Sequence, residues 1–461
     1  MRPFAIGLDD RAVSFARDGH ILSSAPSAVW DGSTGELPGA NAWSGVRRHP
    51  TASSTRHLGS LLTQPVASDR TVALFAAELV RRLAAQSPMP GERVWIAVPA
   101  QASTQGLSAV LAIARSLSLP VDGFVDAAVA SVAALGLERS AIVLEVGMHH
   151  AAATYIDRDG AQVRRRRTAI TERGGLMSFY QGWLELVSAT MVKRTRFDPL
   201  HDAATEQQLF DSLAGWARDA AIDGSARAAL TKGAERFEVA LTRDQFAQAA
   251  ESVHRELLRL LHELRPAGAP VSLVVPSIVA HLPGLRDELE QFVDCELVGV
   301  PDGFAALASS RLDLPERASS DPVRLLRRLP VSVQQDVAAD VSRALLSSRQ
   351  GEDAPPSHLL LNGQVYALRG EPLVIGRMPA AGPRTVTLPE GLAGVSRRHC
   401  TLTSEEGDEV ILLDHSSFGT FVNGERVAER VRVRAGDRVR VGDPGVELAL
   451  IAVDTARSVT N

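Results

Sequence analysis

Three short blocks near the C-terminal end of the chain constrain its fold more than any other feature. They are V-I-G-R at residues 374–377, V-S-R-R-H-C at 395–400 and D-H-S-S-F-G-T-F-V-N-G at 414–424. They lie about 20 residues apart among short segments in which apolar and polar residues alternate. Each block alone is uninformative. In this order and setting they predict a region of short strands whose loops carry turn and polar residues.

The three blocks resemble the forkhead-associated (FHA) domain, a β-sandwich that binds phosphothreonine. A phosphothreonine carries about −2 charge and three acceptor oxygens, so its site needs a guanidinium, hydroxyls and backbone N–H groups on rigidly held loops. The resemblance implies that Gly376 allows a sharp turn and that Arg377 makes a bidentate contact with the phosphate. It also implies that Ser396 and Ser417 supply hydroxyls to the pocket and that Arg397 contacts the bound peptide.

Other residues of the blocks are expected to support this site. The resemblance implies that His399 braces the loop from behind, and Gly419 and Asn423 are typical of turns and hairpins. Phe418 departs from the family, because many FHA domains have Asn at this position to bind the peptide backbone. Phe418 is therefore expected to affect the choice of peptide. The alternative is that Arg377 and Ser396 only hydrogen-bond neighbouring loops.

Length and composition limit the remaining possibilities. The chain has 461 residues, a net charge of −5 and two cysteines, Cys295 and Cys400. The length predicts several domains, the negative charge argues against a nucleic-acid binder, and two isolated cysteines argue against a disulfide framework or a zinc site. The N-terminal residues lack a signal peptide pattern, and apolar runs are too short to cross a membrane. We therefore expect a cytoplasmic protein without membrane insertion.

A polar, proline-containing segment before the C-terminal strands predicts a linker. We expect one domain at residues 1–310, a linker with a short helix at 311–356 and the FHA domain at 357–454. In the first domain the pattern predicts strands at 4–8, 12–16, 20–22 and 93–99, and helices at 71–86, 104–118 and 126–135. It further predicts a strand hairpin at 141–156, a mostly helical region to about residue 265, and a strand-helix-strand unit at 271–300.

This order is similar to the actin-like ATPase fold, an α/β fold of two lobes, and closest to the nucleotide-binding domain of the seventy-kilodalton heat-shock chaperones. Residues 94–100 (V-W-I-A-V-P-A), followed by the alanine-rich helix at 126–135, carry the best match. The segment 173–175 (R-G-G) and the L-P-G-L at 282–285 resemble further family segments. The chaperones' peptide-binding sandwich and helical lid are missing after this region, so no foldase activity is implied.

The resemblance implies a nucleotide cleft between two lobes, with glycine-bearing hairpins around the phosphates and carboxylates that position Mg²⁺. The corresponding hairpins here read Asp9-Asp10-Arg11 and Glu145-Val146-Gly147-Met148, and most of the glycines are missing. Asp10 would place negative charge where a phosphate should lie. The main expectation is therefore a pseudo-ATPase that is not an enzyme and has no cofactor. The alternative is an ATP/Mg site that survives on Asp9, Asp126, Glu145 and Gly147.

Three other features are expected to be structural. His149 and His150 are expected to be exposed turn residues, and the arginines at 164–167 are expected to guard a solvated strand edge. Trp183, Phe210 and Trp216 are expected to lie in the core.

Three functions remain open. The first is a phosphothreonine-dependent adaptor that docks on a Ser/Thr kinase or its substrate. The second is an active ATPase whose nucleotide state is coupled to phosphopeptide docking. The third is a phosphorylation-independent assembly component.

Overall fold

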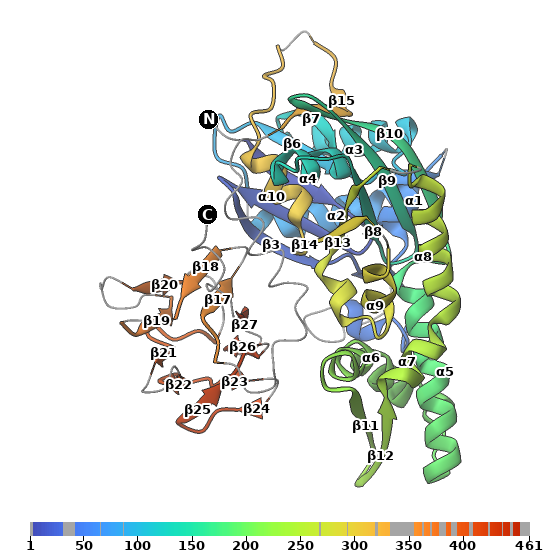
Figure 1. Cartoon of the computed structure of the whole chain (residues 1–461), viewed down its shortest axis with the longest axis vertical. Helices are drawn as coiled ribbons and strands as arrows, with labels where there is room; N and C mark the ends of the chain where they lie inside the picture. The colour runs from blue at the N-terminus through green and yellow to red at the C-terminus, as the bar shows by residue number, and fades with distance from the viewer. Residues whose placement is uncertain are drawn as a thin grey trace. The chain divides into compact units, whose positions relative to one another are not determined.

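Strand β1 (Phe4–Leu8) is buried at every position, as expected of a central strand in a sheet covered on both faces. It pairs antiparallel with β2 (Ala12–Arg17) and parallel with β6 (Val94–Val98). With β3 (His20–Pro26), β7 (Val121–Asp126) and β15 (Arg324–Leu326) they form a sheet in the order β15-β7-β6-β1-β2-β3. This sheet belongs to the first of two units in the computed structural model, Met1–Ala339 and Asp340–Asn461 (Figure 1).

A second sheet in the same unit repeats this plan. Its order is β14-β13-β8-β9-β10-β16, formed by β8 (Ala141–Val146), β9 (Ala151–Asp159), β10 (Gln162–Thr171), β13 (Val271–Pro276), β14 (Cys295–Val300) and β16 (Arg328–Pro330). In each sheet three antiparallel strands, consecutive in the chain, are followed by two parallel strands on the other side of the first. The N-terminal unit is therefore an α/β region with two mixed sheets, consistent with two lobes.

Helices pack around and between these sheets. They are α1 (His57–Thr63), α2 (Asp69–Ala85), α3 (Thr104–Ser116), α4 (Ala127–Leu135), α5 (Leu176–Thr195), α6 (Ala203–Asp223), α7 (Arg243–Ala249), α8 (Glu251–Leu264), α9 (Leu285–Glu290) and α10 (Phe304–Arg311). Helix α4 consists mainly of alanine and valine and is buried along almost its whole length. Its side chains share one core cluster with Ala97 of the first sheet and Val143 of the second. Small residues in α4 therefore allow both sheets to approach it closely.

The mostly helical region expected up to residue 265 contains a β-hairpin. Strands β11 (Ser225–Lys232) and β12 (Glu235–Thr242) pair antiparallel between α6 and α7. Burial alternates along β11, and Gly233 takes a positive φ in the turn. Three alanines in β11 weaken the sequence signal for a strand, because alanine favours helices. The expected core residues Trp183, Phe210 and Trp216 are buried.

Residues 324–330 fall in the range where a linker is expected, but they add an edge strand to each sheet. Strand β15 pairs parallel with β7, and β16 pairs antiparallel with the start of β10. Two three-residue strands are too short to show an alternating pattern, and the free edges of the sheets decide their pairing. The short helix expected in this linker, at about residues 333–346, lies outside the described residues.

The C-terminal unit is a β-sandwich. One sheet has the order β18-β17-β27-β26-β23-β24 and the other β20-β19-β21-β22-β25. The strands are β17 (His358–Leu361), β18 (Gln364–Ala367), β19 (Leu373–Gly376), β20 (Thr385–Thr387), β21 (Cys400–Ser404), β22 (Val410–Asp414), β23 (Thr420–Val422), β24 (Glu425–Arg426), β25 (Arg430–Val433), β26 (Arg438–Val441) and β27 (Val446–Ile451). Leucine and valine side chains from both sheets fill the core between them, which leaves the loops to carry polar residues.

The structure describes residues 3–30, 42–64, 66–85, 87–266, 269–292, 294–318, 321–331, 355–361, 364–368, 371–377, 384–388, 394–404, 409–422, 425–435, 437–442 and 446–451. Shorter elements within these ranges are β4 (Val29–Trp30), β5 (Ser53–Ser54) and 3-10 helices at Ala42–Gly45, Pro199–His201 and Ser277–His281. No helix in this part of the chain is both long and apolar enough to cross a membrane. The same residues contain no group of three or more His, Cys, Asp or Glu side chains placed to hold a metal ion.

Candidate functional site

The end of strand β19 lies directly beneath the loop that precedes β21. A Cβ atom built on Gly376 would be 2.1 Å from the carbonyl oxygen of Arg397, so only glycine allows the two backbones to approach this closely. The N–H group of Arg377 donates to the carbonyl of Ser396 at 3.2 Å. The first two sequence blocks are therefore joined at the point where the side chain of Arg377 leaves the sandwich.

His399 holds the same loop from inside. Its side chain is fully buried, and its backbone N–H donates to Ile375 O at 2.8 Å. Its Nδ1 accepts the N–H of Ser396 at 3.0 Å, which leaves the ring proton on Nε2 to donate to Gly419 O at 3.1 Å. One neutral imidazole thus connects the second block to the third from inside the sandwich.

The third block is attached through Ser396. The N–H of Ser417 donates to Ser396 Oγ at 3.1 Å, which leaves the hydroxyl proton of Ser396 available for an acceptor. The N–H of Gly419 donates to Ser416 Oγ at 2.7 Å, and Gly419 has a φ of +95°. Residues from three loops, Arg377, Ser396 and Ser417, are therefore brought together by hydrogen bonds.

The buried imidazole predicts a loss of stability in acid. Burial holds the pKa of His399 below its ordinary value, so the unfolded chain takes up a proton at about pH 6.5 that the folded sandwich resists. Burial alone would raise the pKa of Asp414, but hydrogen bonds from Ser416 and Thr420 hold it below its ordinary value. Protonation of Asp414 therefore causes a further loss of stability at still lower pH. We expect the sandwich transition in calorimetry of the full chain to move to lower temperature from about pH 7 to about pH 5. His399→Gln should flatten the upper part of this dependence, and an unchanged pH profile in that variant would contradict the assignment.

The loops that carry these residues present both charged and apolar side chains to solvent. Within the described residues the guanidinium of Arg377 has no hydrogen-bond or ion-pair partner, and Arg397 is exposed on the adjacent loop. Phe418 is 60% exposed, which is unusual for a large apolar side chain. Asn423 lies outside the described residues. The surface thus offers a free guanidinium, two hydroxyls and an exposed aromatic ring.

Comparison with known families agrees with this geometry. Residues 373–442 match the family model of the FHA domain. The C-terminal sandwich is an FHA domain. FHA domains bind phosphothreonine-containing peptides, so the sequence resemblance is confirmed for this part of the chain. The search of curated proteins finds no match to this chain.

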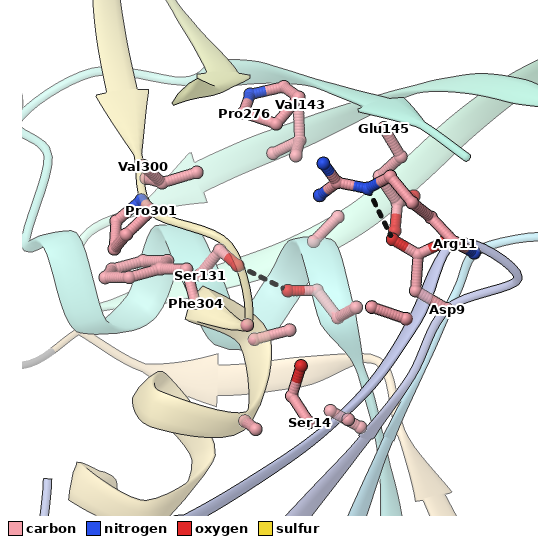
Figure 2. Close-up of a pocket in the computed structure, with 18 of the residues that line it drawn as sticks. Asp9, Arg11, Ser14, Ser131, Val143, Glu145, Pro276, Val300, Pro301 and Phe304 are labelled. Carbon is pink, nitrogen blue, oxygen red and sulfur yellow. Dashed lines mark hydrogen bonds and ion pairs between the residues drawn. The ribbon is translucent and has the colours of Figure 1, made fainter. Parts of the chain in front are cut away.

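The N-terminal unit contains a cavity between its two sheets. The cavity has a volume of about 100 Å³, and apolar residues such as Phe304 and Val143 form one side of it. Figure 2 shows Asp9, Arg11 and Glu145 together at its polar end. Pockets for small-molecule ligands usually have about 300–1,000 Å³, so this cavity is smaller than an ordinary ligand pocket.

Acidic residues at this polar end have unusual pKa values. Burial, followed by repulsion from Asp126 and Asp9, raises the pKa of Glu145 to about 8, and Glu145 Oε2 has no hydrogen-bond partner. Burial also raises the pKa of Asp9 to about 7, with Arg11 opposing the rise. The side chain of Asp9 is 43% exposed, so solvent screening moderates this rise. Glu145 is therefore largely protonated near neutral pH as long as no metal ion lies beside it.

Asp126 has partners within the protein. Its Oδ1 accepts the N–H of Val129 at the start of α4, and its Oδ2 pairs with Arg165 at 2.6 Å. Gly147, the fourth residue considered for a nucleotide site, lies against Asp10, because a Cβ on Gly147 would be 2.1 Å from Asp10 Oδ1. With a small cavity, both oxygens of Asp126 engaged and Asp10 against Gly147, the cleft residues do not fit a magnesium nucleotide.

The expectation of exposed histidines is wrong for His149. Its side chain is buried, and its Nε2 lies 3.0 Å from Thr55 Oγ1. Burial lowers the pKa of His149 to about 4. His150 is half-buried and lies against Asp10. Of the expected arginine edge, Arg164 and Arg166 do pair with Asp157 near the surface, whereas Arg165 turns inward to Asp126.

Proposed function

We propose that this protein is a phosphothreonine-dependent adaptor. The observation that carries the proposal is the meeting of Arg377, Ser396 and Ser417 at one surface of the FHA domain, with the guanidinium of Arg377 unpaired among the described residues. In this proposal Arg377 forms a bidentate contact with the phosphate, and the two serine hydroxyls donate to its remaining oxygens. The partner is a protein phosphorylated on threonine, either a Ser/Thr kinase or a kinase substrate.

For the N-terminal unit we propose an actin-like fold that serves as a scaffold without nucleotide hydrolysis. The repeated strand order of the two sheets supports such a fold, and the small cavity supports the loss of nucleotide binding. The engaged oxygens of Asp126 support the same conclusion. This unit would then position the FHA domain or offer a second binding surface, and no chemical step is assigned to it.

A nucleotide titration tests the scaffold proposal. Calorimetry of the full chain with Mg-ATP at about millimolar concentration should give no binding heat, because the cavity is small and both oxygens of Asp126 are engaged. All five tryptophans lie in the first 216 residues, so thermal unfolding followed by their fluorescence reports on the N-terminal unit alone. The unfolding temperature should be the same with and without Mg-ATP. A saturable stabilisation would instead support an active nucleotide site.

A further inference from the structure

Asp10 connects the two halves of the N-terminal unit. It lies in the turn between β1 and β2, and its side chain reaches the turn between β8 and β9 in the other sheet. Its Oδ1 accepts the N–H of Met148 at 2.7 Å, and its Oδ2 accepts the N–H of His149 at 2.9 Å and of His150 Nδ1 at 3.0 Å. Asp10 is only 1% exposed, so a buried carboxylate receives three donors from the opposite sheet.

The 147–150 turn is shaped to present these donors. Its carbonyl groups at Gly147 and Met148 accept the first N–H groups of α5, from Leu176 at 3.0 Å and Met177 at 2.9 Å. The N–H of Gly147 closes the turn by donating to the carbonyl of His150 at 2.9 Å. With the carbonyls directed at α5, the next two N–H groups converge on Asp10. Successive backbone N–H groups of this kind form anion-binding concavities.

The surrounding charges favour an ionised carboxylate. Burial alone would raise the pKa of Asp10, but the hydrogen bonds from His150, His149 and Met148 hold it below its ordinary value. The pKa of His150 is raised, first by its hydrogen bond to Asp10, although partial burial opposes this. Glu172 also favours the charged imidazole, and Arg56 opposes it. The turn therefore stabilises the negative charge of the Asp10 carboxylate through two backbone N–H groups and the imidazole of His150.

We infer that the 147–150 turn is an oxyanion-binding site that the chain fills with its own Asp10, so that the two sheets are held together without a ligand. Further contacts cross the same boundary. Arg165 of β10 pairs with Asp126 at the end of β7, and β15 and β16 extend both sheets from one short segment. Once Asp10 is removed, the site takes a small oxyanion such as formate or phosphate. This inference is independent of peptide binding by the FHA domain.

The test is chemical rescue of Asp10→Ala, with thermal unfolding of the full chain followed by tryptophan fluorescence. The variant should unfold roughly 5–10 °C below the wild type, since two N–H groups lose their acceptor. Formate or phosphate, compared with chloride at equal ionic strength, should restore part of this loss. The control is Leu273→Ala, which removes a buried side chain of β13 and creates no anion site, so its response measures the general salt effect.

Two further measurements complete the test. Asp10→Asn keeps the volume of the side chain, so it should be destabilised but gain nothing from formate. Hydrogen exchange on the wild type should show the N–H groups of Met148 and His149 protected, and this result does not depend on whether any variant folds. The inference is overturned if these two N–H groups exchange as fast as exposed loops. It is also overturned if Asp10→Ala responds to anions no more than Leu273→Ala.

Discussion

Arg377→Ala is expected to weaken binding of a phosphothreonine peptide by roughly 100-fold, because it removes the charged partner of a doubly charged phosphate. Arg377 lies at the end of β19, where its backbone N–H donates to the carbonyl of Ser396, and its guanidinium has no competing ion pair among the described residues. The positive charge and the N–H donors of this guanidinium are thus available to the phosphate. Arg377→Lys keeps the charge but loses the planar fork, so it should recover only part of the affinity.

The measurement is a fluorescence anisotropy titration of the full chain with a labelled phosphothreonine peptide. The matched control is Arg432→Ala, which removes an exposed arginine of the same sandwich on β25, where it pairs with Glu409. Since β25 is three strands away from β19 in its sheet, this variant should bind as the wild type does. Equal losses in the two variants would mean that overall positive charge, and not the Arg377 site, attracts the peptide.

Gly376→Ala is expected to damage both the stability of the FHA domain and its binding site. The new methyl group would lie 2.1 Å from the carbonyl oxygen of Arg397, and this backbone atom cannot move without displacing the loop that carries Ser396. We expect a loss of about 2–4 kcal/mol in the free energy of unfolding and a large loss of peptide affinity. Ile375→Val on the same strand should cost only about 1 kcal/mol and leave binding intact.

Cys400 offers a local probe for this prediction. It follows His399 directly, is fully buried, and burial raises the pKa of its thiol to about 12. In a Cys295→Ser background, a thiol reagent should label Cys400 at least about tenfold faster in Gly376→Ala than in Ile375→Val, because labelling requires local opening. Unchanged labelling and affinity would show that the loop tolerates the methyl group.

The sequence carries most of the information about the C-terminal site because that site depends on local residue identity. Gly376 is needed for a close approach, His399 for a two-sided hydrogen bond, and Gly419 for a positive φ. Each requirement restricts one position to very few residue types, so the pattern is visible in the three blocks. The exact partners of Ser396 are not visible, since they come from a loop about 20 residues away.

The contacts of Asp10 in the N-terminal unit could not be predicted from the sequence. In the sequence Asp10 is an extra negative charge, and its compensation comes from N–H groups 138 and 139 residues away in the chain. Backbone donors have no residue signature, so no pattern predicts that the 147–150 turn closes around Asp10. The β11–β12 hairpin escaped prediction for a different reason, because its alanines favour a helix when considered alone.

The most direct test of the central claim is a titration of the full chain with a library of phosphothreonine peptides and with the same library in unphosphorylated form. The proposed function predicts saturable binding of phosphorylated peptides only, and its loss in Arg377→Ala. Equal binding of both libraries, or binding that Arg377→Ala leaves unchanged, would contradict it and would favour a phosphorylation-independent assembly role.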